Sequence, residues 1–108
     1  MITRKDLYTI NDVPGRKIIE VLGYVKGSTV QTKNIGKDFM AGLKSLVGGE
    51  IVGYTDMMND ARKVATERLL KDAEEIGANG VVGLRLQTSA VMGGAAEIIA
   101  YGTAVIFE

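Results

Sequence analysis

The chain has 108 residues, 46% of them hydrophobic, and its 13 lysines and arginines balance its 13 aspartates and glutamates. This length allows one domain with a single compact core, and a net charge of zero provides no long-range field to attract nucleic acid or an anionic membrane. The chain contains no cysteine and no histidine, which excludes thiol redox centres, catalytic triads with a histidine base, and metal sites built from thiolate and imidazole. We therefore predict one domain over residues 1–108, with no nucleic-acid or membrane partner.

The start of the sequence is polar. Residues 1–6 lead into mixed polar sequence rather than an apolar signal core. No apolar stretch approaches the roughly 20 residues needed to cross a bilayer. We expect a cytoplasmic protein.

The first regular element is predicted at residues 18–30. This segment is rich in β-branched and aromatic residues and follows the turn-forming pair Pro14-Gly15. The composition predicts a long strand with a bend at Gly23 or Gly27.

Helical periodicity follows the first strand. Apolar residues recur at helical spacing over 35–47, and the stop signal Gly48-Gly49 comes next. A second, longer helix is predicted to begin at an N-cap formed by Thr55 or Asp56 and to end at Gly77. Its predicted apolar stripe consists of Met58, Ala61, Ala65, Leu69, Ala73 and Ile76.

Two further strands are predicted after Gly80. They span 81–88 and 96–107, and Gly93-Gly94 between them allows a hairpin turn. The order of elements favours an α+β fold: a two-layer β-α-β-β sandwich with helices on one face of a small sheet.

The two faces of the last strand are both apolar but differ in size. One face has small residues at its centre, which suits close approach of the chain's own helices. The other face is bulkier and consists of Ile99, Tyr101, Thr103, Val105 and Phe107. Because a bare apolar stripe in water favours aggregation, we predict self-association through Ile99, Tyr101, Val105 and Phe107 or through the sheet edges. The alternative is that the segment Leu7–Ile10 folds across this face.

Four blocks of sequence, in order along nearly the whole chain, resemble the YbjQ-like family of uncharacterised proteins. The blocks are Glu20–Gly27, Asn34–Glu50, Ala78–Gly83 and Ala100–Val105. The resemblance implies a subunit related to the dodecin-like architecture, with the final strand central in the sheet, and a ring-shaped homopentamer. The family's label also implies heavy-metal binding, whereas this chain lacks the thiolate and imidazole ligands that such metals prefer.

The weak candidates for a metal site are carboxylates. Asp56 and Asp60 are one helical turn apart, and Glu50 is near them in sequence. The alternative interpretation is that carboxylates at the start of a helix are stabilised by the helix dipole.

Three other groups of residues have both a functional and a structural interpretation. Methionines bind Cu(I) or fill a core, tyrosines stack on a flavin or lie on a surface, and basic residues around a helix start grip an anion or are simply solvated. The residues are Met40, Met57 and Met58 for copper, Tyr24 and Tyr101 for a flavin, and Arg16, Lys17, Lys33 and Lys37 with Asn34 for an anion.

Three classes of function remain open at this stage. The sequence shows no convergent catalytic set, so we favour a homo-oligomeric, pentameric, non-catalytic binding or scaffold protein. The alternative is a protein that binds a metal or small ligand at subunit interfaces. An enzyme that uses carboxylates or lysines is less favoured but stays open, and the sequence requires no cofactor.

Overall fold

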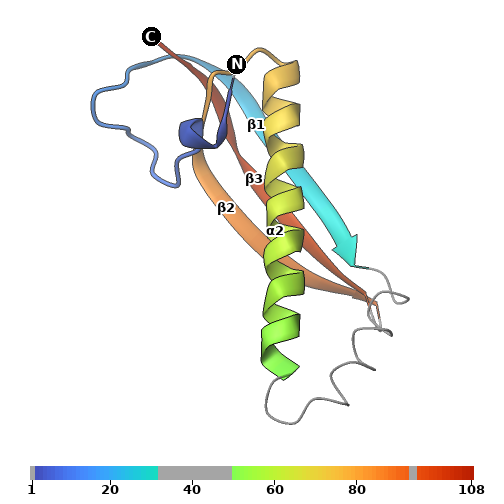
Figure 1. Ribbon diagram of the computed structural model, residues 1–108. Helices are drawn as coiled ribbons and strands as arrows, with labels where there is room; N and C mark the ends of the chain where they lie inside the picture. The colour runs from blue at the N-terminus through green and yellow to red at the C-terminus, as the bar shows by residue number, and fades with distance from the viewer. Residues whose placement is uncertain (1, 32–49, 93–94) are drawn as a thin grey trace.

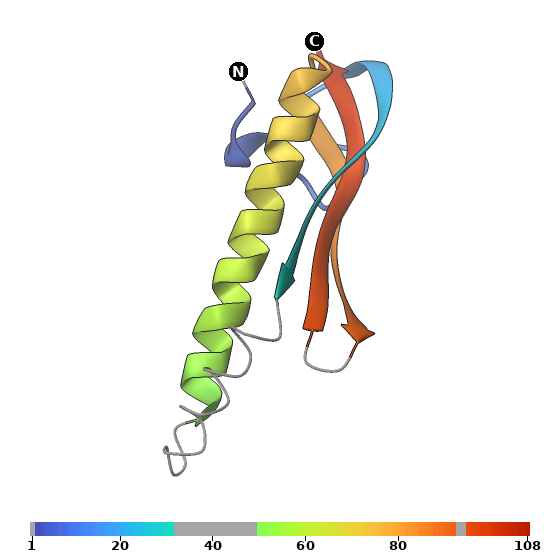
Figure 2. The same cartoon turned by 90° about the vertical axis from the view of Figure 1, so that its right-hand side faces the viewer.

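The computed structural model describes residues 2–31, 50–92 and 95–108, with side chains at all of these positions except 30–31, 50–57, 90–92 and 95–96. The elements are the short 3-10 helix η1 (Arg4–Asp6), strand β1 (Ile18–Gln31), helix α2 (Glu50–Glu75), strand β2 (Gly80–Met92) and strand β3 (Ala95–Phe107). Figure 1 shows α2 crossing one face of the three strands, and Figure 2 shows the helix and the sheet as two layers. The predicted two-layer β-α-β-β fold is confirmed. The helix predicted over 35–47 and the turn pair Gly93-Gly94 lie outside the described residues.

The three strands form one antiparallel sheet in the order β1-β3-β2. The last strand is therefore central, as the family resemblance implied. The pairing of β1 with β3 is irregular between Val21 and Gly23, where Gly23 has a positive φ of 117°. Because glycine adopts this conformation without steric cost, Gly23 is the site of the predicted irregularity in β1.

Helix α2 begins earlier in the sequence than predicted. It already includes Glu50, so Thr55 and Asp56 lie within the helix and neither is its N-cap. Threonine and aspartate are common at N-caps. Here the residues before Thr55 are already helical, so neither Thr55 nor Asp56 caps the helix.

The end of α2 agrees with the prediction. Gly77 has a φ of 84°, its N–H donates to the Glu74 carbonyl at 3.0 Å, and the Ala78 N–H donates to the Ala73 carbonyl at 3.1 Å. These two bonds form a Schellman motif, in which a left-handed glycine satisfies the last free carbonyls of the helix.

The main core lies between α2 and the sheet. Five of the six residues predicted for the helix stripe are buried in it; the exception is Ile76, which is 45% exposed because it lies beyond the last residue of the helix. On β3 the core receives Ile98, Ala100 and Ala104, which lie on the face predicted to meet the helix. No helix in the described part of the chain is long and apolar enough to cross a membrane.

Candidate functional site

The sheet face opposite α2, here called the second face, is covered over only part of its length. At one end Val82, Val105 and Phe107 are buried beneath Tyr8 and other residues of the amino-terminal segment. The Tyr8 and Phe107 rings meet edge to face, with centroids 5.9 Å apart. Val105 and Phe107 were predicted to contact a second copy, but the chain's own amino-terminal segment covers them.

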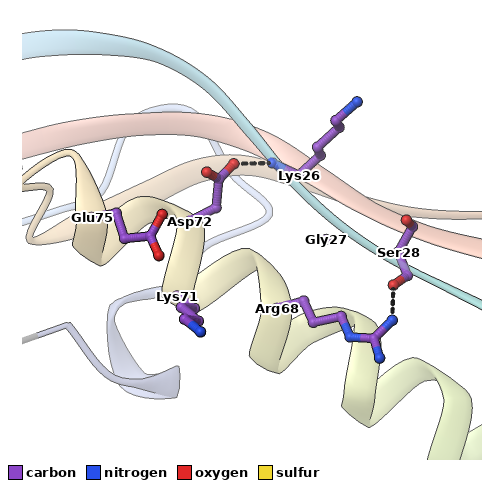
Figure 3. Close-up of a pocket in the computed structure, with 7 residues that line it drawn as sticks. All are labelled: Lys26, Gly27, Ser28, Arg68, Lys71, Asp72 and Glu75. Carbon is purple, nitrogen blue, oxygen red and sulfur yellow. Dashed lines mark hydrogen bonds between the residues drawn. The ribbon is translucent and has the colours of Figure 1, made fainter.

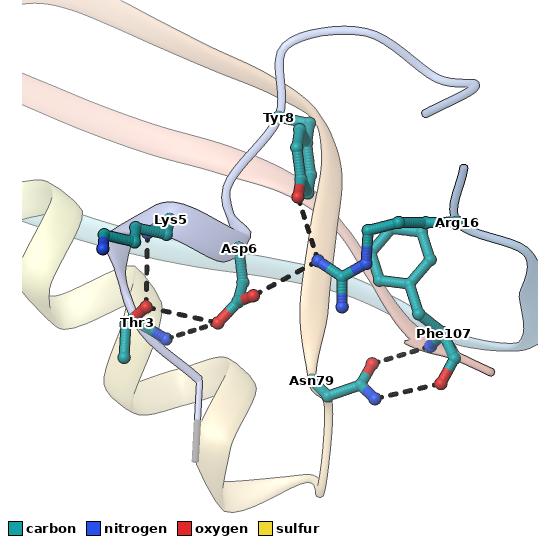
Figure 4. Close-up of polar contacts among 7 residues, drawn as sticks. All are labelled: Thr3, Lys5, Asp6, Tyr8, Arg16, Asn79 and Phe107. Carbon is teal, nitrogen blue, oxygen red and sulfur yellow. Dashed lines mark hydrogen bonds and ion pairs between the residues drawn. The ribbon is translucent and has the colours of Figure 1, made fainter. Parts of the chain in front are cut away.

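Arg16 fastens this segment to the sheet. Its guanidinium carbon lies 4.1 Å from the centroid of the Phe107 ring, a favourable position for a cation over an aromatic face. Its Nη1 donates to the Tyr8 hydroxyl at 2.9 Å and to Asp6 Oδ1 at 3.2 Å (Figure 4). One side chain thus connects two points of the segment with the end of β3.

Asp6 is itself held by several hydrogen bonds. Burial raises the pKa of its carboxyl, but donation from the Thr3 backbone at 2.9 Å and from Arg16 outweighs burial and places the pKa below its ordinary value of 3.8. The charged form of Asp6 is therefore favoured in the folded protein.

Elsewhere on the second face, three large side chains are exposed among the described residues. Val21, Tyr24 and Tyr101 are 64%, 77% and 39% exposed, and we call these three residues the bare patch. Tyr24 lies opposite Thr103, two positions along β3 from Tyr101, so the two tyrosines are diagonal neighbours within reach of each other. Large apolar side chains gathered in this way on a surface mark a site of interaction.

The outer edge of β1 is partly occupied by side chains of α2. The Lys26 N–H donates to Asp72 Oδ2 at 3.1 Å, and the Ser28 carbonyl accepts from Arg68 Nη1 at 2.6 Å (Figure 3). A free strand edge presents unpaired backbone groups on which another strand can pair. Asp72 and Arg68 prevent such pairing at the middle of β1.

The outer edge of β2 is occupied at its start by the amino-terminal segment. The Tyr8 N–H donates to the Val81 carbonyl at 2.8 Å, and the Leu84 N–H donates to the Tyr8 carbonyl at 3.0 Å. A third bond joins the Gly83 N–H to the Ile10 carbonyl at 3.2 Å. Farther along β2, Leu86 is 47% exposed.

Two grooves run beside α2, and both are lined mainly by charged residues. The groove between α2 and β1, about 420 Å³, is lined by Lys26, Gly27, Ser28, Arg68, Lys71, Asp72 and Glu75. The groove between α2 and β2, about 240 Å³, is lined by Arg4, Asn59, Arg62, Lys63, Thr66, Glu67 and Leu86. Among their described contacts none joins a nucleophile to a base, which is the arrangement that covalent catalysis requires.

Of the three predicted metal ligands, the structure describes the side chain of Asp60 alone. Asp60 is exposed on α2, whereas the side chains of Glu50 and Asp56 lie outside the described residues. Among the residues that the structure describes, no three acidic side chains gather in a way that would hold a metal ion.

The other sequence candidates have separate positions. Met58 is 7% exposed and belongs to the core, and the Arg16 guanidinium lies over the Phe107 ring. Lys17 is exposed. Met40, the Met57 side chain, Lys33, Asn34 and Lys37 lie outside the described residues.

Comparison with known proteins decides the family. A family model described as "Putative heavy-metal-binding" matches residues 6–108. The chain belongs to the YbjQ-like family. Among its YbjQ-like relatives, a UPF0145 protein of Halalkalibacterium halodurans is 62% identical over 94% of this chain and 96% of its own length, and one of Thermus thermophilus is 54% identical over 93% and 88%.

The fold of this YbjQ-like chain also occurs in a solved structure. A protein of unknown function from Pediococcus pentosaceus superposes with a TM-score of 0.62 at 19% identity, covering 94% of this chain and 96% of that one. At this identity the similarity establishes the fold alone.

The donor atoms of this YbjQ-like chain do not fit the metal that the family description names. Heavy metals prefer thiolate and imidazole ligands, and the chain has no cysteine and no histidine. Its only sulfur atoms are those of five methionines, and Met58 points into the core. We therefore derive no chemistry through a heavy metal.

The residues that occupy the strand edges could not be predicted from the sequence. Asp72 and Arg68 belong to the polar side of α2, where charged residues are ordinary and give no signal of a contact with β1. The role of Arg16 was missed for a similar reason: its two residues of contact, Tyr8 and Phe107, are far apart in sequence.

Proposed function

We propose that this protein is a homo-oligomeric, non-catalytic binding or scaffold protein, and that five copies form a ring in the cytoplasm. The observation that supports self-association most directly is the bare patch. Val21, Tyr24 and Tyr101 stay exposed although the neighbouring end of the same face is covered. A second copy is the simplest cover for this surface.

The absence of a catalytic arrangement in the described grooves supports the non-catalytic part of the proposal. The side-chain hydrogen bonds of Arg16, Asp72 and Arg68 connect segments of the fold. Arg16 holds the amino-terminal segment, and Asp72 and Arg68 hold α2 to β1. These are contacts of a rigid building unit.

Native mass spectrometry of protein purified without chelator tests the assembly. We expect a single species with the mass of five chains. Additional mass in multiples of five would favour the alternative function, a metal or small-ligand site repeated in each subunit or interface. A monomer at micromolar concentration would contradict the proposal.

Tyr101→Glu tests the role of the bare patch. A buried carboxylate without a partner is costly, so the variant should dissociate to smaller species, whereas Tyr101→Phe keeps an apolar ring and should retain the wild-type mass. If Tyr101→Glu stayed soluble with the wild-type mass, the patch would not be an interface.

A further inference from the structure

Within the described residues, the two outer strands have backbone groups without a hydrogen-bond partner at defined positions. In an antiparallel ladder, the N–H and C=O groups of successive residues point alternately to the two edges of a strand. The Lys26 N–H is bonded to Asp72 and not to β3, so Lys26 points away from the sheet. Tyr24, two positions before it in the regular part of β1, points outward as well.

The same alternation can be followed across β3. Lys26 lies opposite Tyr101, so Tyr101 points toward β2 and its neighbour Ala100 points toward β1. Leu86 lies opposite Ala100, and its backbone groups therefore point to the outer edge of β2. Thr88 points outward by the same rule.

Val21 is also an outward position, on the other side of the irregularity in β1. It lies opposite Val105, whose carbonyl accepts from the Asn79 N–H on the β2 side at 3.2 Å. Since Val105 is turned to β2, Val21 is turned away from the sheet.

The chain's own atoms occupy only some of these outward positions. On β1, Asp72 and Arg68 bond Lys26 and Ser28, while Val21 and Tyr24 have no such bond among the described residues and are exposed. On β2 the amino-terminal segment bonds the stretch from residue 81 to 84, while Leu86 and Thr88 in the described part are exposed and unbonded at their outer edge.

The open stretch of β1 is suited to pair with the open stretch of β2 of another copy, rather than with a second β1. Both β1 and β2 are antiparallel to β3 and so run in the same direction. When one copy is rotated beside another about an axis near the strand direction, β2 of the first meets β1 of the second in parallel. A contact between unlike edges is heterologous, and heterologous contacts close rings, including rings with an odd number of subunits.

The positions of the two open stretches along the strand direction also agree with a ring. Tyr24 lies level with Thr103 on β3, whereas Leu86 lies level with Ala100. Pairing them shifts neighbouring copies along the strands. Strands in a closed sheet are tilted and staggered in this way.

We propose that the open stretch of β2 at Leu86–Thr88 pairs in parallel with the open stretch of β1 at Val21–Tyr24 of the next copy. The inference rests on the proposed self-association and adds to the bare patch the strand edges that meet and the direction in which they pair. Asp72, Arg68 and the amino-terminal segment occupy the other bonded positions, so that within the described residues one open stretch is left on each edge.

Cross-linking of introduced cysteines tests the contact, and the chain's lack of cysteine makes it specific. Val21 and Gln87 are exposed, and their partners on β3, Val105 and Ile99, place both on the second face. We expect the double variant Val21→Cys with Gln87→Cys to give a ladder of linked subunits with a short bismaleimide, and each single variant to give none.

The outcomes separate this inference from the proposed function. Cross-linked dimers of Gln87→Cys alone would show that two β2 edges meet and would overturn it. The double variant could also keep the wild-type oligomeric mass and give no ladder. That result would overturn the edge pairing and leave self-association intact. A wild-type monomer would overturn both.

Hydrogen exchange of the wild-type protein provides a measurement without substitution. In the oligomer, the Leu86 and Thr88 amides should exchange more slowly than unpaired amides of the same local sequence. Exchange at the unpaired rate in an intact oligomer would overturn the edge pairing.

Discussion

Gly27 determines how closely the helix and the sheet approach each other. A Cβ at this position would overlap backbone atoms of α2 at Ala65, Arg68 and Leu69. Because the clash is with backbone and not with the end of a flexible side chain, the helix as a whole would have to move. The same approach lets Asp72 and Arg68 reach the edge of β1.

Gly27→Ala should lower the free energy of unfolding by about 1–3 kcal/mol, the usual cost of overpacking. Urea denaturation followed by circular dichroism measures the change. Ser28→Ala is the matched control and should change stability by less than about 0.5 kcal/mol. Equal stability of Gly27→Ala and wild type would show that the layers separate at no cost.

Asp6 should make stability depend on pH in the acid range. Its pKa in the folded protein is lowered below 3.8, so its contribution is complete above that value and is lost as the pH falls through the folded pKa. Asp6→Asn should therefore remove part of the loss of thermal stability that the wild type shows below about pH 4. Parallel curves of melting temperature against pH for the two proteins would contradict this assignment.

At the scale of elements, the amino-terminal segment acts as a cover for one end of the second face. Its contacts are concentrated in Tyr8, which packs on Phe107, accepts from Arg16 and pairs with the edge of β2. Loss of the Tyr8 side chain should therefore release the segment without disrupting the core beneath α2.

Tyr8→Ala should speed amide exchange at Gly83 and Leu84 and increase the binding of a hydrophobic dye, because Val105 and Phe107 become accessible. Ile10→Ala is the control: Ile10 belongs to the same segment but is 50% exposed. Unchanged exchange in Tyr8→Ala would mean that the backbone bonds alone hold the segment.

The strands were predictable because their signal is local. The β-branched runs after Pro14-Gly15 and after Gly80 coincide with β1, β2 and β3, and Gly77 ends α2 as its conformation demands. The start of α2 was not predictable from Thr55 or Asp56, because these residue types favour N-caps but also occur inside helices. The helix already includes residues 50–54, which shows that the N-cap prediction was wrong.

At the scale of the whole molecule, the sequence indicated that one sheet face needs a cover but not which part of it lacks one. The size contrast between Ala100 and Tyr101 predicted the face that meets α2. Whether Val105 and Phe107 are covered depends on the path of the amino-terminal segment, which Arg16 fixes through contacts distant in sequence. Long-range contacts of this kind leave no periodic pattern.

The central position of β3 also affects how the chain is made. In the described sheet, β1 and β2 have no ladder with each other, and the strand that each of them pairs with is β3, which is the last of the three to be synthesised. At about 5–20 residues per second, a ribosome takes several seconds to proceed from β1 to β3. During that interval β1 and β2 emerge without the strand that both of them pair with. Folding of the sheet must therefore follow translation of β3. A chaperone that shields nascent strands should raise the yield of folded protein.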